Sequence, residues 1–289
     1  MYWDPTDPDK KNPYRKQKAT ISISSKKAAT AEYGTSYSIK SGVTAKDKIT
    51  KRSLTSKVTY TVTKYSNGKY KKAAFSTKSL GTYRIKYAVK SSLGVTTTKT
   101  FTVKVVDTKA PAITAKNRTV NINTTNAVSG VSAKMASGKS VTSSMSVKIK
   151  APGASAYTTY SYAKAKAYKF TKAGTYYVQY VAKNVNKPNR ATTKTVKITV
   201  LGDAVIKSTK AVTVKDTATE DQIKAAVREA ITITDNGTTV KSTAATVTIS
   251  KDSEGVVTAT VSYKGKNGKT VTYKVTAVSY THLTLPTTS

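Results

Sequence analysis

The residue types that carry out acid–base and nucleophilic chemistry are scarce in this chain. It has no Cys, and its one His is His282. Ser24 and Lys27 match the S-x-x-K pattern of serine acyl transfer, but the S-D-N and K-T-G segments that accompany that pattern are absent. Glycoside hydrolysis needs two facing carboxylates, whereas residues 108–203 contain one acidic residue, Asp203. We therefore predict that the chain is not an enzyme and has no catalytic residue.

Ligands for a metal or cofactor are scarce for the same reason. Zinc sites rest on Cys and His, and Ca²⁺ needs several oxygen ligands with negative charge. The loop from Lys46 to Arg52 offers one acidic residue, Asp47, among four basic residues. An isopeptide bond between Lys and Asn would need an acidic side chain in the same core, and Asp203 comes at the end of its segment. We therefore predict no metal, no cofactor and no such cross-link.

Positive charge is the most unusual property of the sequence. The chain has 50 basic and 14 acidic residues and a net charge of +36. Residues 1–107 carry +17, residues 108–203 carry +15, and residues 204–289 carry +4. The bases are 44 Lys and 6 Arg, whereas proteins that read nucleobases or clamp phosphates rely on Arg. This composition predicts a diffuse positive field that attracts anionic polymers.

Two groups of lysines are candidates for contact with such a polymer. They are Lys69, Lys71 and Lys72 beside the Asn67-Gly68 turn, and Lys164, Lys166 and Lys169 within the Tyr-rich segment 157–170. That segment places Tyr160, Tyr162, Tyr168 and Phe170 on one parity. It is either a core strand with a Lys-rich loop or a basic, aromatic binding face. The lysines also have a second interpretation, in which they only keep an extended spacer soluble.

An internal repeat indicates the elements that position these side chains. The stretch from Gly81 to Asp107 returns from Gly174 to Asp203, a period near 93 residues, which indicates tandem domains. In both arms of each copy, apolar residues alternate with polar ones, as in half-buried strands. A hairpin cannot bury its apolar face alone and needs a second sheet. We therefore predict an all-β chain of tandem β-sandwiches.

The repeated residues resemble a known family. The pattern G-T-Y-x-[IV]-x-Y, a loop, a Thr-rich strand and V-x-V-x-D resembles bacterial immunoglobulin-like (Ig-like or HYR-like) repeats of cell-surface proteins, and so does G-V-T-A-x-D from Gly42 to Asp47. The resemblance implies Ig-like repeats over residues 17–107 and 108–203. It also implies that Tyr83 and Tyr176 are structural corner residues, each buried with its hydroxyl bonded to the backbone.

Residues 204–277 predict a third β-sandwich-like repeat with one inserted short helix. Thr219 and Gln222 have the spacing of a capping box at the start of this helix, which we expect to run from about Thr219 to Ala230. Its apolar stripe is Ile223, Ala226, Val227 and Ala230. Strands are predicted at 231–233, 245–249, 256–263 and 270–277, and an Asn-Gly turn at 267–268 joins the last two.

The two ends of the sequence differ from the repeats. Residues 1–16 have the composition of an unstructured leader or linker. They lack the apolar core of a signal peptide, so an export signal would lie outside this fragment. Trp3 is either an aromatic contact for a sugar or partner, or a residue without a tertiary role. Residues 278–289, VSYTHLTLPTTS, resemble a translated sequencing adapter, so we expect the natural sequence to stop near Ala277 and His282 to have no role.

These observations predict non-catalytic spacer repeats of a larger protein on the bacterial cell surface or cell wall. The alternative is the accessory region of a secreted carbohydrate-active or peptidoglycan-active enzyme, and the flanking coding sequence would separate the two. The expected partners are anionic cell-wall polymers or acidic glycans, with non-specific binding of nucleic acid in vitro. No apolar run is long enough to span a membrane, and we expect the repeats to be monomeric.

Overall fold

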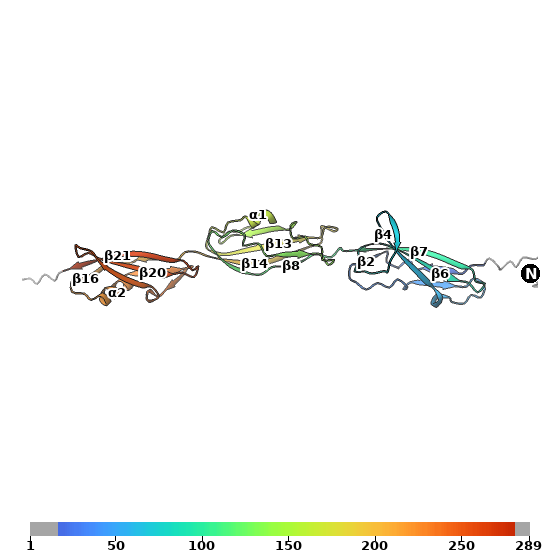
Figure 1. Cartoon of the computed structure of the whole chain (residues 1–289), viewed down its shortest axis with the longest axis horizontal. Coiled ribbons are helices and arrows are strands. Elements are labelled where there is room, and N and C mark those ends of the chain that lie inside the picture. The colour runs from blue at the N-terminus through green and yellow to red at the C-terminus, as the bar shows by residue number, and fades with distance from the viewer. Residues whose placement is uncertain (1–16, 281–289) are drawn as a thin grey trace, which may run out of the picture. The chain divides into compact units, whose positions relative to one another are not determined.

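The computed structural model describes residues 17–280 and shows an all-β chain of tandem Ig-like β-sandwiches (Figure 1). Its internal contacts group into two compact units. Among the described residues, the first unit contains residues 17–112, 133–141 and 183–192, and the second contains residues 113–132, 142–182 and 193–280. The predicted repeat boundaries after residues 107 and 203 do not coincide with the division between these units, and they stay predictions.

Residues 20–106 of the first unit form two sheets around one core. One sheet pairs β1 (Thr20–Ile23) with β3 (Val43–Lys46). The other has five strands in the order β2 (Thr30–Glu32), β7 (Thr96–Val106), β6 (Gly81–Lys90), β4 (Thr59–Ser66) and β5 (Lys69–Lys72), and a 3-10 helix at Thr55–Lys57 precedes β4. Ile21 and Val43 from the small sheet share one buried cluster with Ile85 and Val103 from the large sheet. Two sheets that bury their apolar faces against each other are a β-sandwich.

Alternation decides which face of β6 is buried. Its even-numbered residues Arg84 and Lys86 are exposed, while Tyr83, Ile85 and Tyr87 are buried, as the period of two requires. The turn from β4 to β5 depends on Asn67 and Gly68, whose φ angles are 49° and 80°. Gly adopts this left-handed conformation freely and Asn tolerates it, so the hairpin predicted at this turn is confirmed.

A second five-stranded sheet repeats this plan. Its order is β12 (Thr158–Ser161), β11 (Ser146–Lys150), β13 (Gly174–Lys183), β14 (Ala191–Leu201) and β9 (Arg118–Asn121), and the short strands β8 (Ala112–Thr114) and β10 (Ser132–Lys134) are not part of it. Val178 on β13 lies opposite Ile149 on β11, just as Ile85 lies opposite Val62 in the first sheet. The two copies of the sequence repeat therefore share one strand register.

The Tyr-rich segment does not form the single strand that its parity suggested. It contains β12 and then a short helix, α1 (Tyr162–Lys166), so Tyr160 and Tyr162 do not share one strand face. Alanine and lysine favour a helix, and the Ser161 side chain accepts a hydrogen bond from the Lys164 N–H at the helix start. Phe170 is fully buried, and its ring packs edge-on against Tyr168 and Tyr176. The aromatic part of the segment thus belongs largely to the core.

The last two sheets, in the second unit, share one core with a helix. The three-stranded sheet has the order β15 (Val205–Ser208), β17 (Ile231–Asp235) and β18 (Thr238–Val240). The four-stranded sheet has the order β16 (Val212–Lys215), β21 (Thr270–Tyr280), β20 (Val257–Lys264) and β19 (Thr246–Lys251). A 3-10 helix spans Ser242–Ala244. The helix α2 (Glu220–Glu229) begins after Thr219, which forms the predicted capping box with Gln222. Ile223 and Val227 bury its apolar stripe in the core of these two sheets. The predicted helix is confirmed.

The strand β21 extends three residues beyond Ala277, the end predicted for the third repeat, and the predicted domain bounds stay predictions. β21 continues to Tyr280. Its last three residues pair in parallel with residues 213–215 of β16. Composition changes after Ala277, but backbone pairing with β16 does not depend on which side chains follow. Residues 281–289, His282 included, and residues 1–16, Trp3 included, lie outside the described part of the chain, so the predictions made for them stay predictions.

Removing residues 278–289 is therefore expected to lower stability relative to removing residues 281–289 alone. The longer deletion takes away three residue pairs between β16 and β21. At about 0.5–1.5 kcal/mol for each backbone hydrogen bond, the loss should be about 1–3 kcal/mol. Urea unfolding of the two truncated chains measures this difference directly. Equal unfolding midpoints would show that these pairs contribute nothing.

Candidate polyanion-binding surface

Each of the four carboxylates of residues 17–203 has a hydrogen-bond or ion-pair partner within the chain. This stretch contains 35 basic and four acidic residues. Glu32 accepts bonds from the N–H and hydroxyl of Thr108, Asp47 from three backbone N–H groups, Asp107 from the N–H of Ser137, and Asp203 from the side chains of Asn267 and Lys269. The lysines of this stretch are therefore left with a largely uncompensated positive charge.

Asp47 shows most clearly how such a carboxylate is held. It is 1% exposed, and it accepts hydrogen bonds from the N–H groups of Ser92 (2.7 Å), Thr50 (3.0 Å) and Ile49 (2.9 Å). The bonds from Ser92 and Thr50 are the largest cause that holds the pKa of Asp47 well below its usual range. The side chain thus fixes the loop after β3 to the loop between β6 and β7.

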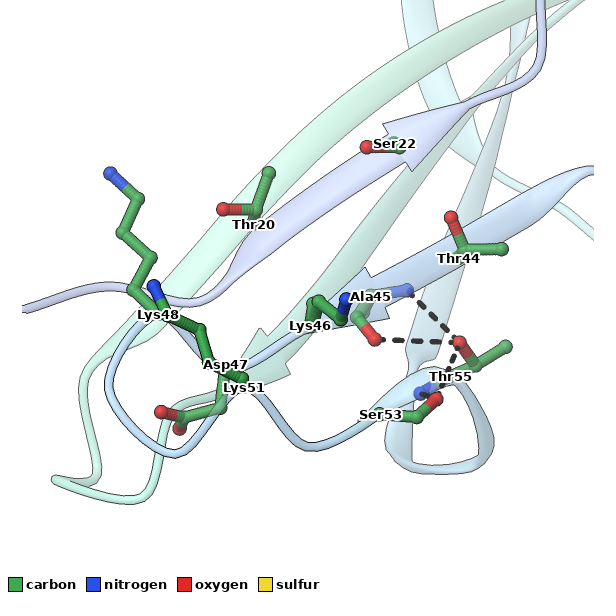
Figure 2. Close-up of a pocket in the computed structure, with 10 residues that line it drawn as sticks. All are labelled: Thr20, Ser22, Thr44, Ala45, Lys46, Asp47, Lys48, Lys51, Ser53 and Thr55. Atoms are coloured by element: carbon green, nitrogen blue, oxygen red, sulfur yellow. Dashed lines mark hydrogen bonds between the residues drawn. The ribbon is translucent and has the colours of Figure 1, made fainter.

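A groove of about 460 Å³ lies beside Asp47, along the outer side of β1 and β3 (Figure 2). Its lining consists of Thr20, Ser22, Thr44, Ala45, Lys46, Asp47, Lys48, Lys51, Ser53 and Thr55. Thr55 accepts a hydrogen bond from the Ala45 N–H (3.1 Å) and so secures one wall. The acidic side chain of this lining is engaged by the backbone, so the groove offers hydroxyl groups and ammonium groups.

The six lysines predicted as contacts are all exposed. Lys69, Lys71 and Lys72 lie on β5, the edge strand of the first five-stranded sheet. Lys164 and Lys166 lie on α1, and Lys169 follows that helix. The two groups belong to different units, so the structure gives no single site that contains all six. Whether they bind an anionic polymer stays a prediction.

Sequence reasoning missed a set of cations that are supported by tyrosine rings. On the first five-stranded sheet, the guanidinium carbon of Arg84 lies 3.8 Å from the centre of the Tyr70 ring. Tyr65 packs edge-on against Tyr70 at 5.2 Å. The three residues lie on β4, β5 and β6. Tyr65 and Tyr70 are paired across the Asn67-Gly68 turn, and the pairing of β4 with β6 brings Arg84 to them.

The second five-stranded sheet has a similar cluster. The ammonium nitrogens of Lys150 and Lys197 lie 5.4 Å and 5.9 Å from the centre of the Tyr177 ring, and Lys150 is also 5.4 Å from the Tyr157 ring centre. Tyr177 is 36% exposed and Lys197 is exposed. Attraction between a cation and the face of an aromatic ring orders both side chains without cancelling the charge.

Two pairs of tyrosines anchor the sheets that carry these clusters. Tyr83 and Tyr176 are each 1% exposed. The Tyr83 hydroxyl donates to the Ser79 carbonyl (2.9 Å), and the Tyr176 hydroxyl accepts from the Lys172 N–H (3.2 Å), so both bonds reach four residues back along the chain. Tyr87 and Tyr180 are also buried, and their hydroxyls donate to the carbonyls of Ile39 and Val128.

Within residues 17–280, no three His, Cys, Asp or Glu side chains come together as a metal site would require. No helix in this part of the chain is long and apolar enough to cross a membrane.

Comparison with known proteins gives a likeness of fold only. No family model and no curated protein sequence matches the chain. Among solved structures, it is similar to protocadherin gammaB7 EC3-6 in a cis-dimer structure, with 13% identity, a TM-score of 0.34, and 91% of this chain and 76% of that chain covered. Mouse cadherin-23 EC22-24 matches at 10% identity and a TM-score of 0.32, covering 91% and 99% of the two chains. Values this low carry no argument about ligand or function.

Proposed function

We propose that this chain is a non-catalytic, extracellular spacer region of a larger bacterial surface or cell-wall protein, and that its lysines hold it on anionic polymers. The observation that carries the proposal is the excess of 35 basic over four acidic residues between residues 17 and 203, where each carboxylate already has a partner in the chain. A basic surface with few acidic neighbours attracts polyanions and releases their counter-ions on binding. The resemblance of the repeats to bacterial Ig-like domains supports the extracellular, bacterial setting.

Binding of the chain to purified teichoic acid tests this proposal. The affinity should fall steeply between low and physiological ionic strength, because exposed charges are screened beyond about 8–10 Å in the latter. Replacing the six predicted lysines by glutamine should weaken binding at least tenfold, because each neutralised contact removes part of the counter-ion release.

The matched control replaces six exposed lysines of the last two sheets and their loops. These are Lys207, Lys210, Lys215, Lys241, Lys251 and Lys274. They lie in the nearly neutral part of the chain, where acidic residues are interspersed, so their loss should change the affinity little. Equal losses in the two variants, or an affinity that ignores salt, would leave the lysines with a role in solubility alone.

A further inference from the structure

We propose that the outer face of each five-stranded sheet between residues 59 and 201 carries a binding strip for an acidic polysaccharide. The strip is a row of outward side chains across the strands, in which cations contact tyrosine rings. In the first sheet the row contains Lys72 and Arg84, and Tyr70 lies beside the row as the ring partner of Arg84. In the second sheet it contains Lys150, Tyr177 and Lys197. This inference rests on the proposed function and assigns it to particular side chains.

Strand register shows that each strip is one row. In the first sheet Lys72 lies opposite Thr63, Thr63 opposite Arg84, and Arg84 opposite Thr102. In the second sheet Lys150 lies opposite Tyr177, and Lys197 on the next strand reaches the Tyr177 ring. Arg84, Tyr177 and Lys197 belong to the outward parity of β6, β13 and β14, since their neighbours on either side along the strand are buried. Lys72 and Lys150 share that face through their register with Thr63 and Tyr177.

The two rows occupy the same place in the two copies. Arg84 follows the corner residue Tyr83, and Tyr177 follows the corner residue Tyr176. Thr63 and Lys150 each follow the residue that pairs with Ile85 or Val178. At this shared position the first copy has the cation Arg84, which contacts a ring on another strand, and the second copy has the ring Tyr177, which is contacted by cations on other strands. A contact between a cation and a ring at this position is therefore common to both copies.

Spacing within a row suits an extended acidic chain. Lys72 and Arg84 are on strands separated by one strand, and so are Lys150 and Lys197. Neighbouring strands lie about 4.8 Å apart, so the cations of each pair are roughly 10 Å apart across the sheet. Carboxylates on alternate sugars of an extended polysaccharide have a spacing of that order. The Thr63 and Thr102 hydroxyls, which lie in the first row, can bond to the sugar hydroxyls between them.

Ring partners make Arg84, Lys150 and Lys197 different from ordinary surface lysines. A carboxylate partner would cancel the charge, whereas a ring orders the cation and leaves its charge available. The ring faces are thereby occupied: Arg84 lies 3.8 Å above Tyr70, and two lysines approach Tyr177. Stacking of nucleobases needs free ring faces. Many phosphate sites are nests of free backbone N–H groups, whereas the N–H groups of the interior strands β6, β11 and β13 pair within their sheets, so we favour a carboxylate-bearing polysaccharide.

The test measures binding of the full chain to polygalacturonate, inorganic polyphosphate, single-stranded DNA and neutral dextran. The row variant combines Arg84→Gln, Lys150→Gln and Lys197→Gln. The matched control loses the same charge at three exposed lysines that belong neither to the rows nor to the six predicted contacts, by Lys78→Gln, Lys116→Gln and Lys139→Gln. A second variant, Tyr70→Leu with Tyr177→Leu, keeps the net charge and removes the rings. Thermal unfolding verifies that each variant is folded.

We expect the wild-type chain to prefer polygalacturonate and the row variant to lose at least tenfold more affinity for it than the control. The ring variant should lose about two- to fivefold for each ring, the value of an exposed cation–ring contact. Equal losses in the row and control variants would overturn the rows and leave diffuse polyanion binding intact. Preference for polyphosphate or DNA would overturn the choice of a carboxylate ligand. Failure of the wild-type chain to bind any of the three anions would overturn both the rows and the proposed function.

Discussion

Replacing Asn184 by alanine is expected to destabilise the first unit by about 3–5 kcal/mol, the largest effect of any single substitution considered for this chain. The side chain is 0% exposed. Its amide donates to the carbonyls of Asp107 (3.2 Å) and Lys109 (2.7 Å), and its oxygen accepts from the N–H groups of Asn186 (2.7 Å) and Lys187 (3.0 Å). Alanine removes four hydrogen bonds at once, each with a net value of about 0.5–1.5 kcal/mol, although the Asp107 carbonyl keeps a bond from the Asn186 amide.

Asn186→Ala is the matched control for this prediction. Asn186 is exposed, and its amide makes one bond of 3.0 Å to the Asp107 carbonyl, so its loss should cost about 0.5–1.5 kcal/mol. Asn184→Asp adds a second test, because it keeps the accepting oxygen but turns a carboxylate oxygen towards two carbonyls. Urea unfolding should rank both Asn184 variants well below Asn186→Ala. Similar losses for Asn184→Ala and Asn186→Ala would show that Asn184 is not the organising residue of this loop.

Local sequence signals predicted the elements whose causes are local. The capping box of Thr219 and Gln222 fixed the start of α2, and the Asn67-Gly68 pair identified a hairpin. Alternation identified β6 and β13 because one face of each is buried. The short helix α1 was missed, because the alternating Tyr, Ala and Lys residues imitate a strand while the cap at Ser161 favours a helix. Two signals of opposite meaning share those residues.

The side chains of the candidate rows could not be found in the same way. Arg84 meets Tyr70, and Lys197 meets Tyr177, only because strands distant in the sequence are neighbours in a sheet. The lysines selected from sequence were those crowded together along the chain, which is a poor guide to proximity across strands. Asn184 was overlooked for a related reason. Its partners at Asp107 and Lys109 lie 77 and 75 residues away in the sequence.

Raising the pH from about 10 to about 12 is expected to destabilise the chain through two buried tyrosines. Burial raises the pKa of Tyr87 and of Tyr180 to about 12, whereas an unfolded tyrosine titrates near 10. Each hydroxyl donates to a backbone carbonyl, of Ile39 and of Val128 respectively, and a phenolate cannot donate. The folded chain therefore keeps both protons at a pH where the unfolded chain has lost them.

The sign of the effect follows from proton linkage. Stability is fully present below pH 10, because both states are then protonated, and it falls as pH rises through the folded pKa values. The loss should reach about 2 kcal/mol for each tyrosine. Deprotonation of lysines in the same range relieves repulsion among the 35 bases of residues 17–203 and acts in the opposite direction, so the tyrosine contribution has to be isolated by comparison of variants.

Tyr87→Phe combined with Tyr180→Phe provides that comparison. The double variant loses two hydrogen bonds, so it should be less stable than the wild type at neutral pH by about 1–3 kcal/mol. It has no phenol to ionise at these positions, so the difference between the two chains should shrink or reverse between pH 10 and pH 12. Tyr65→Phe, at a side chain that is 50% exposed, is the control and should leave the pH dependence unchanged. Urea unfolding across this range decides the matter, because a constant difference at every pH would mean that neither buried phenol governs alkaline unfolding.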